Sequence, residues 1–224
     1  MQFRQQSDMS LMRGWFLPNF VLFLMLYGPD ARSDAAVTLS PADLSAWQET
    51  RFVGRTLYRV EEGGRGPALH AVADGSASGL CRAVEIDLAA LPILRWSWRL
   101  DRAPDRADER ARAGDDQGLR LAFLHWSGAG EDSILAIQYV WSQNEPAGAR
   151  WANPYVANAW QVAARSGPAQ PGRWHAERRD LTADFRAAFG RSVDRVDAVC
   201  LMSDGDQTGA LVEAWYGDIT LQAR

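Results

Sequence analysis

The stretch DRVDAVCLMSDGDQTGALVEAWYGDITL, residues 194–221, carries the strongest signals for the fold. Its pattern predicts two β-strands, Arg195–Ser203 and Leu211–Leu221, because both runs are rich in apolar and β-branched residues. Glycines and short polar side chains fill residues 204–209 between them, and such residues favour a turn. A β-hairpin is therefore expected here.

Alternating apolar residues predict which strand faces turn toward a core. Successive side chains of a strand point to opposite faces, so residues two apart share a face. In the second strand of the hairpin the predicted inner row is Leu211, Trp215, Ile219 and Leu221. The run Pro92–Asp101 alternates most clearly, and its predicted inner row is Leu94, Trp96, Trp98 and Leu100.

Short predicted strands separated by turn signals continue through most of the chain. The exception is a helix near residues 181–189, where Asp180 or Thr182 is a suitable cap and Gly190 a suitable stop. Such a pattern is typical of two packed antiparallel sheets. The expected fold is an all-β, antiparallel, jelly-roll-like β-sandwich with one short helix.

Composition limits the function classes. The 224 residues have 47% hydrophobic content, enough for a sizeable core, and we expect one domain at residues 36–224. All 24 basic residues are arginine and the net charge is −4, so no basic stripe indicates nucleic-acid binding.

The first 35 residues resemble an export signal. Arg4 and Arg13 precede the apolar run Trp15–Tyr27, and small residues follow at 33–36. Thirteen residues are too few to cross a hydrocarbon core, which needs about 20. We therefore expect residues 1–35 to be a signal peptide, the mature protein to have no membrane span, and its location to be periplasmic or secreted. An oxidising compartment would allow Cys81 and Cys200 to pair, although two separate buried thiols fit the sequence equally well.

Several short motifs, in their order along the chain, resemble a family of exported bacterial proteins called domain of unknown function 3047. They span roughly Trp47 to Thr220 and are Leu94-Arg95-Trp96-Ser97-Trp98-Arg99, Ala113-Gly114-Asp115-Asp116 with Arg120, Tyr139-Val140-Trp141, Asn153-Pro154-Tyr155, Gly172-Arg173-Trp174, Asp180 with Asp184-Phe185 and Phe189-Gly190, Asp204-Gly205-Asp206-Gln207-Thr208-Gly209, and Ala214-Trp215-Tyr216-Gly217-Asp218-Ile219. The resemblance implies export and a single domain, and it implies no catalytic residue.

The acidic turn is a candidate metal site. Asp204, Asp206 and Thr208 alternate, so their oxygens could converge on a hard cation such as calcium, with Asp218 joining from the next strand. The alternative is that these aspartates cap backbone amides of the turn.

Two further groups are candidate ligand contacts. Asp115 and Asp116 precede a strand that bears Arg120, and they either contact a polar ligand at a cleft rim or form a buried ion pair. The aromatic residues Trp141, Trp151 and Tyr155 either stack on sugar rings or pack in the core.

These features favour an exported domain that binds a glycan or another polar ligand through an aromatic-lined face, without turnover. One alternative is a carbohydrate-active lyase or hydrolase, which would need a deep cleft where some of its candidate residues converge, namely Asp115, Asp116, Arg120, His125 or Tyr139. Another is an envelope protein that binds a protein partner through an exposed patch.

Overall fold

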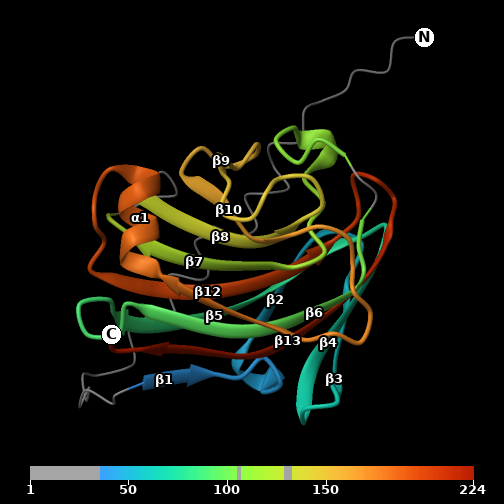
Figure 1. The fold of residues 1–224 in the computed structure, drawn as a ribbon, viewed down its shortest axis with the longest axis horizontal. Coiled ribbons are helices and arrows are strands. Elements are labelled where there is room, and N and C mark those ends of the chain that lie inside the picture. Colours follow the sequence, from blue (N-terminus) through green and yellow to red (C-terminus); the bar gives the residue numbers. More distant parts are fainter. Residues whose placement is uncertain (1–35, 105–106, 129–132) are drawn as a thin grey trace.

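A computed structural model describes residues 36–104, 107–128 and 133–224, so the predicted signal peptide lies outside the described residues. Two β-sheets pack face to face, and one α-helix lies beside them (Figure 1). The expected all-β sandwich is confirmed. Among the described residues, no helix has the length and apolar character needed to cross a membrane.

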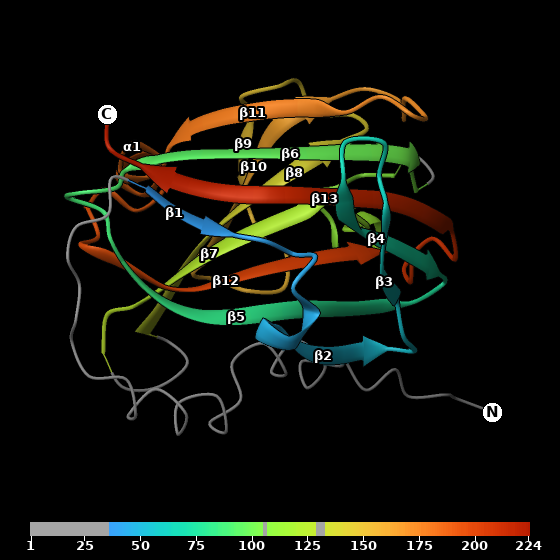
Figure 2. The ribbon, with the colours of Figure 1, turned by 90° about the horizontal axis from the view of Figure 1, so that it is seen from below.

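Sheet A has six strands in the order β11-β6-β13-β4-β3, with β1 paired to β13 (Figure 2). Its strands are β1 (Ala36–Leu39), β3 (Leu57–Glu62), β4 (Pro67–Asp74), β6 (Ile93–Arg102), β11 (His175–Asp180) and β13 (Leu211–Gln222).

Sheet B has seven strands in the order β2-β5-β12-β7-β8-β10-β9. Its strands are β2 (Gln48–Val53), β5 (Ala77–Asp87), β7 (Arg120–Trp126), β8 (Ile134–Ser142), β9 (Arg150–Ala152), β10 (Ala159–Ser166) and β12 (Arg195–Asp204). The pairing of β8 with β10 is parallel, and the other strand pairs of both sheets are antiparallel.

The predicted helix is confirmed as α1 (Leu181–Phe189). The Asp180 side chain accepts a hydrogen bond from the Ala183 amide, which caps the first turn, and Gly190 ends the helix at a positive φ of 68°. Phe185 is fully buried and belongs to the main core. The described residues also form two short 3₁₀ turns, Leu44–Ala46 and Arg112–Gly114.

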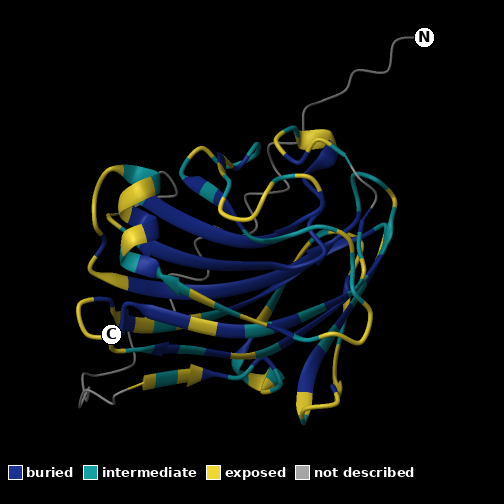
Figure 3. Cartoon of the chain, viewed as in Figure 1, coloured by how far each residue is buried: buried dark blue, intermediate teal, exposed yellow. Residues whose placement is uncertain are grey.

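The core lies between the sheets and is rich in aromatic rings. Trp96 and Trp98 are buried there, as predicted, and contact Tyr139 and Trp141 from β8 across the interface. Strands β7 and β8 are buried along almost their whole length (Figure 3). Both faces of sheet B are thus covered at these two central strands.

The predicted hairpin at residues 194–221 is wrong. Its two strands form, but β12 belongs to sheet B and β13 to sheet A, so residues 205–210 cross from one sheet to the other. Turn residues show that a chain reverses, and they carry no information about whether the flanking strands pair.

The predicted inner row of β13 is correct for Ile219 and Leu221 and wrong for Trp215. A bulge between Tyr216 and Ile219 shifts the alternation, so Tyr216 enters the core and Trp215 lies on the outer face. There Trp215 stacks on His70 at 4.0 Å between ring centroids, and the Arg99 guanidinium lies 4.3 Å from its ring.

Cys81 and Cys200 form a disulfide, which the sequence left open. The two residues are directly opposite each other on the paired strands β5 and β12, with 4.1 Å between their Cα atoms. Their bond joins neighbouring strands in the middle of sheet B.

Candidate functional site

The candidate site is a polar cluster on the face of sheet B that points away from sheet A. At its centre is Arg120, the first residue of β7, which is only 2% exposed. Its guanidinium donates to the Asp115 carbonyl at 2.9 Å and to the Gln138 side chain at 3.3 Å. It also lies 3.4 Å from a carboxylate oxygen of both Asp115 and Asp204. A buried guanidinium therefore joins loop, sheet and acidic turn.

Asp115 and Asp116 point in different directions, as expected for adjacent residues. Asp115 contacts Arg120 and accepts a hydrogen bond from the buried Gln161 side chain. Asp116 accepts from the Thr208 amide at 2.7 Å and from the Thr208 hydroxyl at 2.6 Å. Asp116 thereby holds the 205–210 crossing against the loop before β7.

The acidic turn brings two more carboxylates to the same place. Asp204 is buried, and its carboxylate accepts a hydrogen bond from the Gln117 backbone amide at 3.2 Å. Asp206 accepts from the Gln207 side chain through Oδ2, while its Oδ1 has no hydrogen-bond partner among the described residues. Asp116, Asp204 and Asp206 each have an oxygen within 4.8 Å of the others.

The structure does not bring all four predicted metal ligands together. Asp204 and Asp206 are neighbours, but the Thr208 hydroxyl donates to Asp116. Asp218 is exposed on β13, seven residues beyond Leu211, or about 23 Å at the usual rise of a strand. The group of three carboxylates instead includes Asp116, which the sequence assigned to a different candidate site.

A pocket of about 60 Å³ lies within this cluster. Its polar lining comes from Asp115, Arg120, Gln138, Tyr155, Asp204, Asp206 and Gln207, and its apolar lining from Phe52, Ala77, Val156 and Met202. It is smaller than typical small-molecule sites, which measure about 300–1,000 Å³. Only one end of a larger ligand fits inside.

Burial and crowding change the acidities of the pocket residues. Burial raises the pKa of Asp204 well above its ordinary value, with Arg120 opposing the rise and Asp115 adding to it. Burial also raises the pKa of Asp115, again against Arg120. Burial and the charge of Asp116 raise the pKa of Asp206 to about 6. The pocket therefore contains carboxyl groups that retain protons to unusually high pH.

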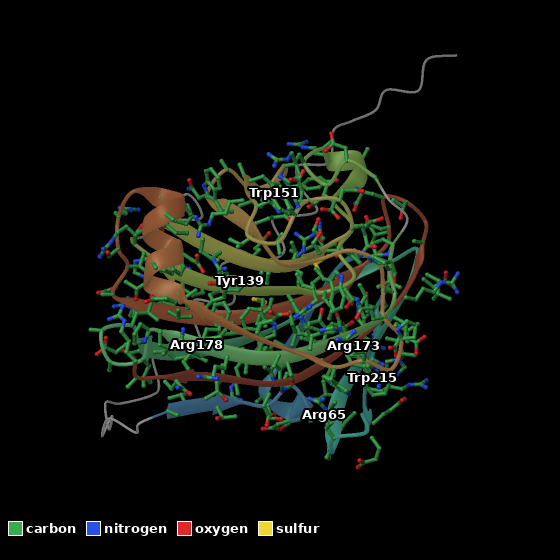
Figure 4. The ribbon with its side chains drawn as sticks, in the orientation of Figure 1. Arg65, Tyr139, Trp151, Arg173, Arg178 and Trp215 are labelled. Atoms are coloured by element: carbon green, nitrogen blue, oxygen red, sulfur yellow. A yellow bond between two sulfur atoms is a disulfide. The ribbon has the colours of Figure 1, made fainter. Side chains whose placement is uncertain are left out.

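Two of the three predicted aromatic contacts are buried, which corrects the expectation of an aromatic-lined face. Trp141 is 1% exposed and packs in the core between the sheets. Trp151, which is labelled in Figure 4, is 3% exposed, and its indole N–H donates to the Glu109 carbonyl. Tyr155 alone reaches the pocket, where its hydroxyl donates to the Arg112 carbonyl at 2.8 Å.

Two residues of the enzyme alternative lie elsewhere. The Tyr139 hydroxyl donates to the buried Asp184 at 2.7 Å, on the core side of sheet B. His125, near the other end of β7, lies 3.4 Å from Asp197. Neither Tyr139 nor His125 therefore lines the pocket.

Several residues of the cluster were missed in the sequence, among them Gln161 and Met202. Gln161 is fully buried in β10, within the otherwise apolar run Trp160–Ala164. A lone amide in such a run is the signal that could have indicated a buried polar cluster. Met202 is an ordinary apolar residue of β12 and gives no such signal.

Comparisons with known proteins identify a family and several distant likenesses. A family model described as "Protein of unknown function (DUF3047)" matches residues 45–220. No curated protein matches the sequence.

Three solved structures illustrate the likenesses. A family 11 carbohydrate-binding module of a Clostridium thermocellum cellulase is 8% identical to this chain. The match covers 80% of this chain and 88% of the module, with a TM-score of 0.45. A variant of the Cel12A cellulase of Rhodothermus marinus is 13% identical, with coverage of 84% and 100% and a TM-score of 0.47. The xyloglucanase domain of NopAA from Sinorhizobium fredii is 9% identical, with coverage of 87% and 100% and a TM-score of 0.43. With TM-scores below 0.5, these likenesses assign no ligand to this chain.

Proposed function

Because this chain belongs to the DUF3047 family, whose description assigns no function, we propose one from the pocket itself. The protein binds a hydroxyl-rich ligand there, and the class we favour is a glycan. Polar groups of the pocket hold the ligand, in place of the stacked aromatic rings that the sequence suggested.

One observation supports this proposal above the others. Two buried atoms of pocket residues, the Nε donor of Arg120 and the Oδ1 acceptor of Asp206, have no hydrogen-bond partner among the described residues. Buried polar atoms usually have partners, and leaving one without costs about 1–3 kcal/mol. Both residues line the pocket, and a ligand hydroxyl group that reached these two atoms through a small side-chain shift would satisfy both, because a hydroxyl group donates and accepts.

The mixed protonation of the pocket also suits hydroxyl groups. A carboxyl group that keeps its proton donates a hydrogen bond, whereas an ionised one only accepts. Asp206, with a pKa of about 6, donates below this pH and accepts as a charged group above it, and burial raises the pKa of Asp204 in the same direction. Because the pocket is small, we expect it to take one sugar end while the rest of the chain lies outside.

Calorimetric titration of the purified protein with a panel of oligosaccharides tests this proposal. We expect saturable heat for at least one oligosaccharide, and about a tenfold or greater loss of affinity with Asp206→Asn, because the uncharged amide is a poorer acceptor. The control is Asp218→Asn, which removes the same charge on the exposed surface of β13. If Asp206→Asn binds like the wild type, or if no oligosaccharide gives heat, the proposal is wrong.

The second candidate function is that of an enzyme, and the observation that favours it is the raised pKa of Asp206. A carboxyl group with a pKa of about 6 can serve as a general acid in glycoside hydrolysis. Incubating the oligosaccharides of the panel with the protein and analysing the products by mass spectrometry separates the candidates. Shortened products that disappear with Asp206→Asn indicate hydrolysis, whereas an oligosaccharide that binds in the titration and stays intact indicates binding without hydrolysis.

Calcium receives less support. Its sites need about six to eight oxygen ligands, and Arg120 already offsets the charge of Asp115 and Asp204. A protein partner also receives less support, because few large hydrophobic residues of the described part are exposed, namely Val53, Leu57 and Val60, whereas a protein interface usually needs a larger apolar patch.

We also propose that residues 1–35 direct export to the periplasm or beyond, leaving residues 36–224 as one mature domain. The Cys81–Cys200 disulfide supports an oxidising compartment. Mass spectrometry of the protein recovered from a periplasmic fraction should give the mass of a chain that begins near Ala36.

A further inference from the structure

A second polar surface lies on the outer face of sheet A, and neither the sequence nor the family assigns it a role. It is an open groove of about 600 Å³ between the β3–β4 turn and the segment before β11. Its lining includes the side chains of Arg65, Arg99, Arg173 and Trp174. Figure 4 shows Arg65 and Arg173 near the end of sheet A where Trp215 also lies. The volume lies within the range of typical ligand sites, about 300–1,000 Å³.

The groove is held in shape by contacts beneath it. The Gly63 carbonyl accepts from the Trp174 indole N–H at 2.7 Å and from Arg99 at 3.4 Å. The Asp101 carboxylate accepts from the Gly172 amide at 2.8 Å and pairs with Arg99 at 2.8 Å. Both sides of the groove are therefore fixed to β6. Such pre-organisation lowers the entropy cost of binding.

The residues that line the groove include three arginines and no acidic residue. Asp101 offsets the charge of Arg99, but Arg65 and Arg173 are exposed and form no ion pair among the described residues. Arginine presents a planar fork of donors that matches carboxylate and sulfate groups. The groove therefore suits an anionic group.

The charge continues along the same face as a pair of arginines. Arg95 of β6 and Arg178 of β11 are directly opposite each other, and both are exposed without an ion pair among the described residues. Like charges in this position destabilise a sheet. An anionic partner that lies across them would remove the repulsion.

An aromatic ring in the groove favours a sugar polymer. The half-buried Trp174 ring lines the groove and offers an apolar surface for a sugar. An acidic polysaccharide combines such sugars with the anionic groups that arginines bind, and a nucleic acid is the comparison in the test.

We propose that this outer face of sheet A binds an acidic polysaccharide, with its anionic groups at Arg65 and Arg173 in the groove and at Arg95 and Arg178 beside it. This arginine surface is separate from the pocket of sheet B, so either proposal can fail without the other.

Binding of polygalacturonate to the immobilised protein, with its methyl ester as the uncharged comparison, tests the proposal. We expect polygalacturonate to bind, the methyl ester to bind at least about tenfold more weakly, and added salt to weaken binding by screening. Two double variants, Arg65→Gln/Arg173→Gln and Arg95→Gln/Arg178→Gln, should each lose about tenfold or more in affinity, since each removes two charge-assisted contacts.

The matched control is Arg186→Gln/Arg191→Gln, which removes two exposed charges at and after α1 and so changes the net charge equally. Equal binding of the ester, equal affinities of the test and control variants, or tighter binding of oligothymidylate would each overturn the proposal. Melting temperatures verify folding, and Arg95→Gln/Arg178→Gln should melt no lower than wild type because it relieves repulsion.

Discussion

Asp206 links the pH to the stability of the folded protein. Its pKa rises from an ordinary 3.8 to about 6, because burial and Asp116 disfavour the charged form. Between these two values the folded protein keeps a proton that the unfolded chain releases. Stability from this residue is therefore present below pH 4 and is lost as the pH rises through 6.

Asp206→Asn should remove this dependence. We expect its melting temperature to fall less than that of wild type between pH 4 and pH 6.5, and to be higher than that of wild type at pH 7, because the variant ionises no carboxyl group there. Calorimetric scans across this pH range measure the effect. Asp218→Asn is the control, and a wild-type-like slope for Asp206→Asn would contradict the assignment.

Individual residues of the site could be predicted from the sequence, but their grouping could not. The acidic turn and the pair before β7 stood out because short polar residues interrupt apolar strands. Asp116 and Asp206 are far apart in the chain, and they meet because β12 pairs with β7. Strand pairing is a tertiary property that no local pattern encodes.

At the scale of elements, the disulfide is the covalent link between two neighbouring strands. It joins β5 to β12 across a sequence separation of 119 residues. Closing so long a loop restricts the unfolded chain, and native disulfides typically contribute about 2–4 kcal/mol.

Cys81→Ala/Cys200→Ala should therefore lower the free energy of unfolding by about 2–4 kcal/mol. Denaturant titration monitored by tryptophan fluorescence measures the change. Adding a reductant to the wild type should reproduce most of the loss while leaving the double variant unaffected. A variant as stable as the oxidised wild type would show that the bond adds nothing to stability.

Strand β13 shows where periodicity fails as a predictor. Strict alternation placed Trp215 with Ile219 and Leu221, and this holds only while the strand is regular. Gly217 lies in the bulge, where the Cβ atom of any other residue would collide with the Ser97 hydroxyl. The bulge adds one residue to β13 relative to β6, so the side chains beyond it point to the opposite face from the one that strict alternation predicts. Glycine in a strand is a known signal for a bulge, but it does not tell whether the residues before the bulge or those after it follow the predicted inward pattern.

At the scale of the whole molecule, the pocket lies where the chain passes between the sheets. The connection from β2 to β3 and that from β12 to β13 both make this passage, the latter through residues 205–210. Neither passage could be foreseen, because a crossing and a hairpin use the same turn residues. The proposed binding pocket and the architecture therefore depend on the same junction.

Buried hydroxyl groups fasten this junction. Thr56, between β2 and β3, is fully buried, and its hydroxyl donates to the Ser203 carbonyl of β12 at 2.9 Å. The same oxygen accepts from the Ser78 amide of β5 at 3.2 Å. Tyr216 of sheet A extends the network by donating to the Met202 carbonyl at 2.6 Å. Removing one of these oxygens leaves buried backbone groups without partners.

Thr56→Val keeps the shape of the side chain and removes the oxygen, so it should lower the free energy of unfolding by about 1–3 kcal/mol. Thr38→Val is the matched control, because the Thr38 hydroxyl contacts Thr220 at an exposed position and its loss should cost less than about 0.5 kcal/mol. Denaturant titration of both variants measures the difference. Because the Ser203 carbonyl precedes Asp204, Thr56→Val should also weaken oligosaccharide binding at the pocket, whereas Thr38→Val should not. If Thr56→Val loses stability but binds normally, the junction supports the fold without positioning the site.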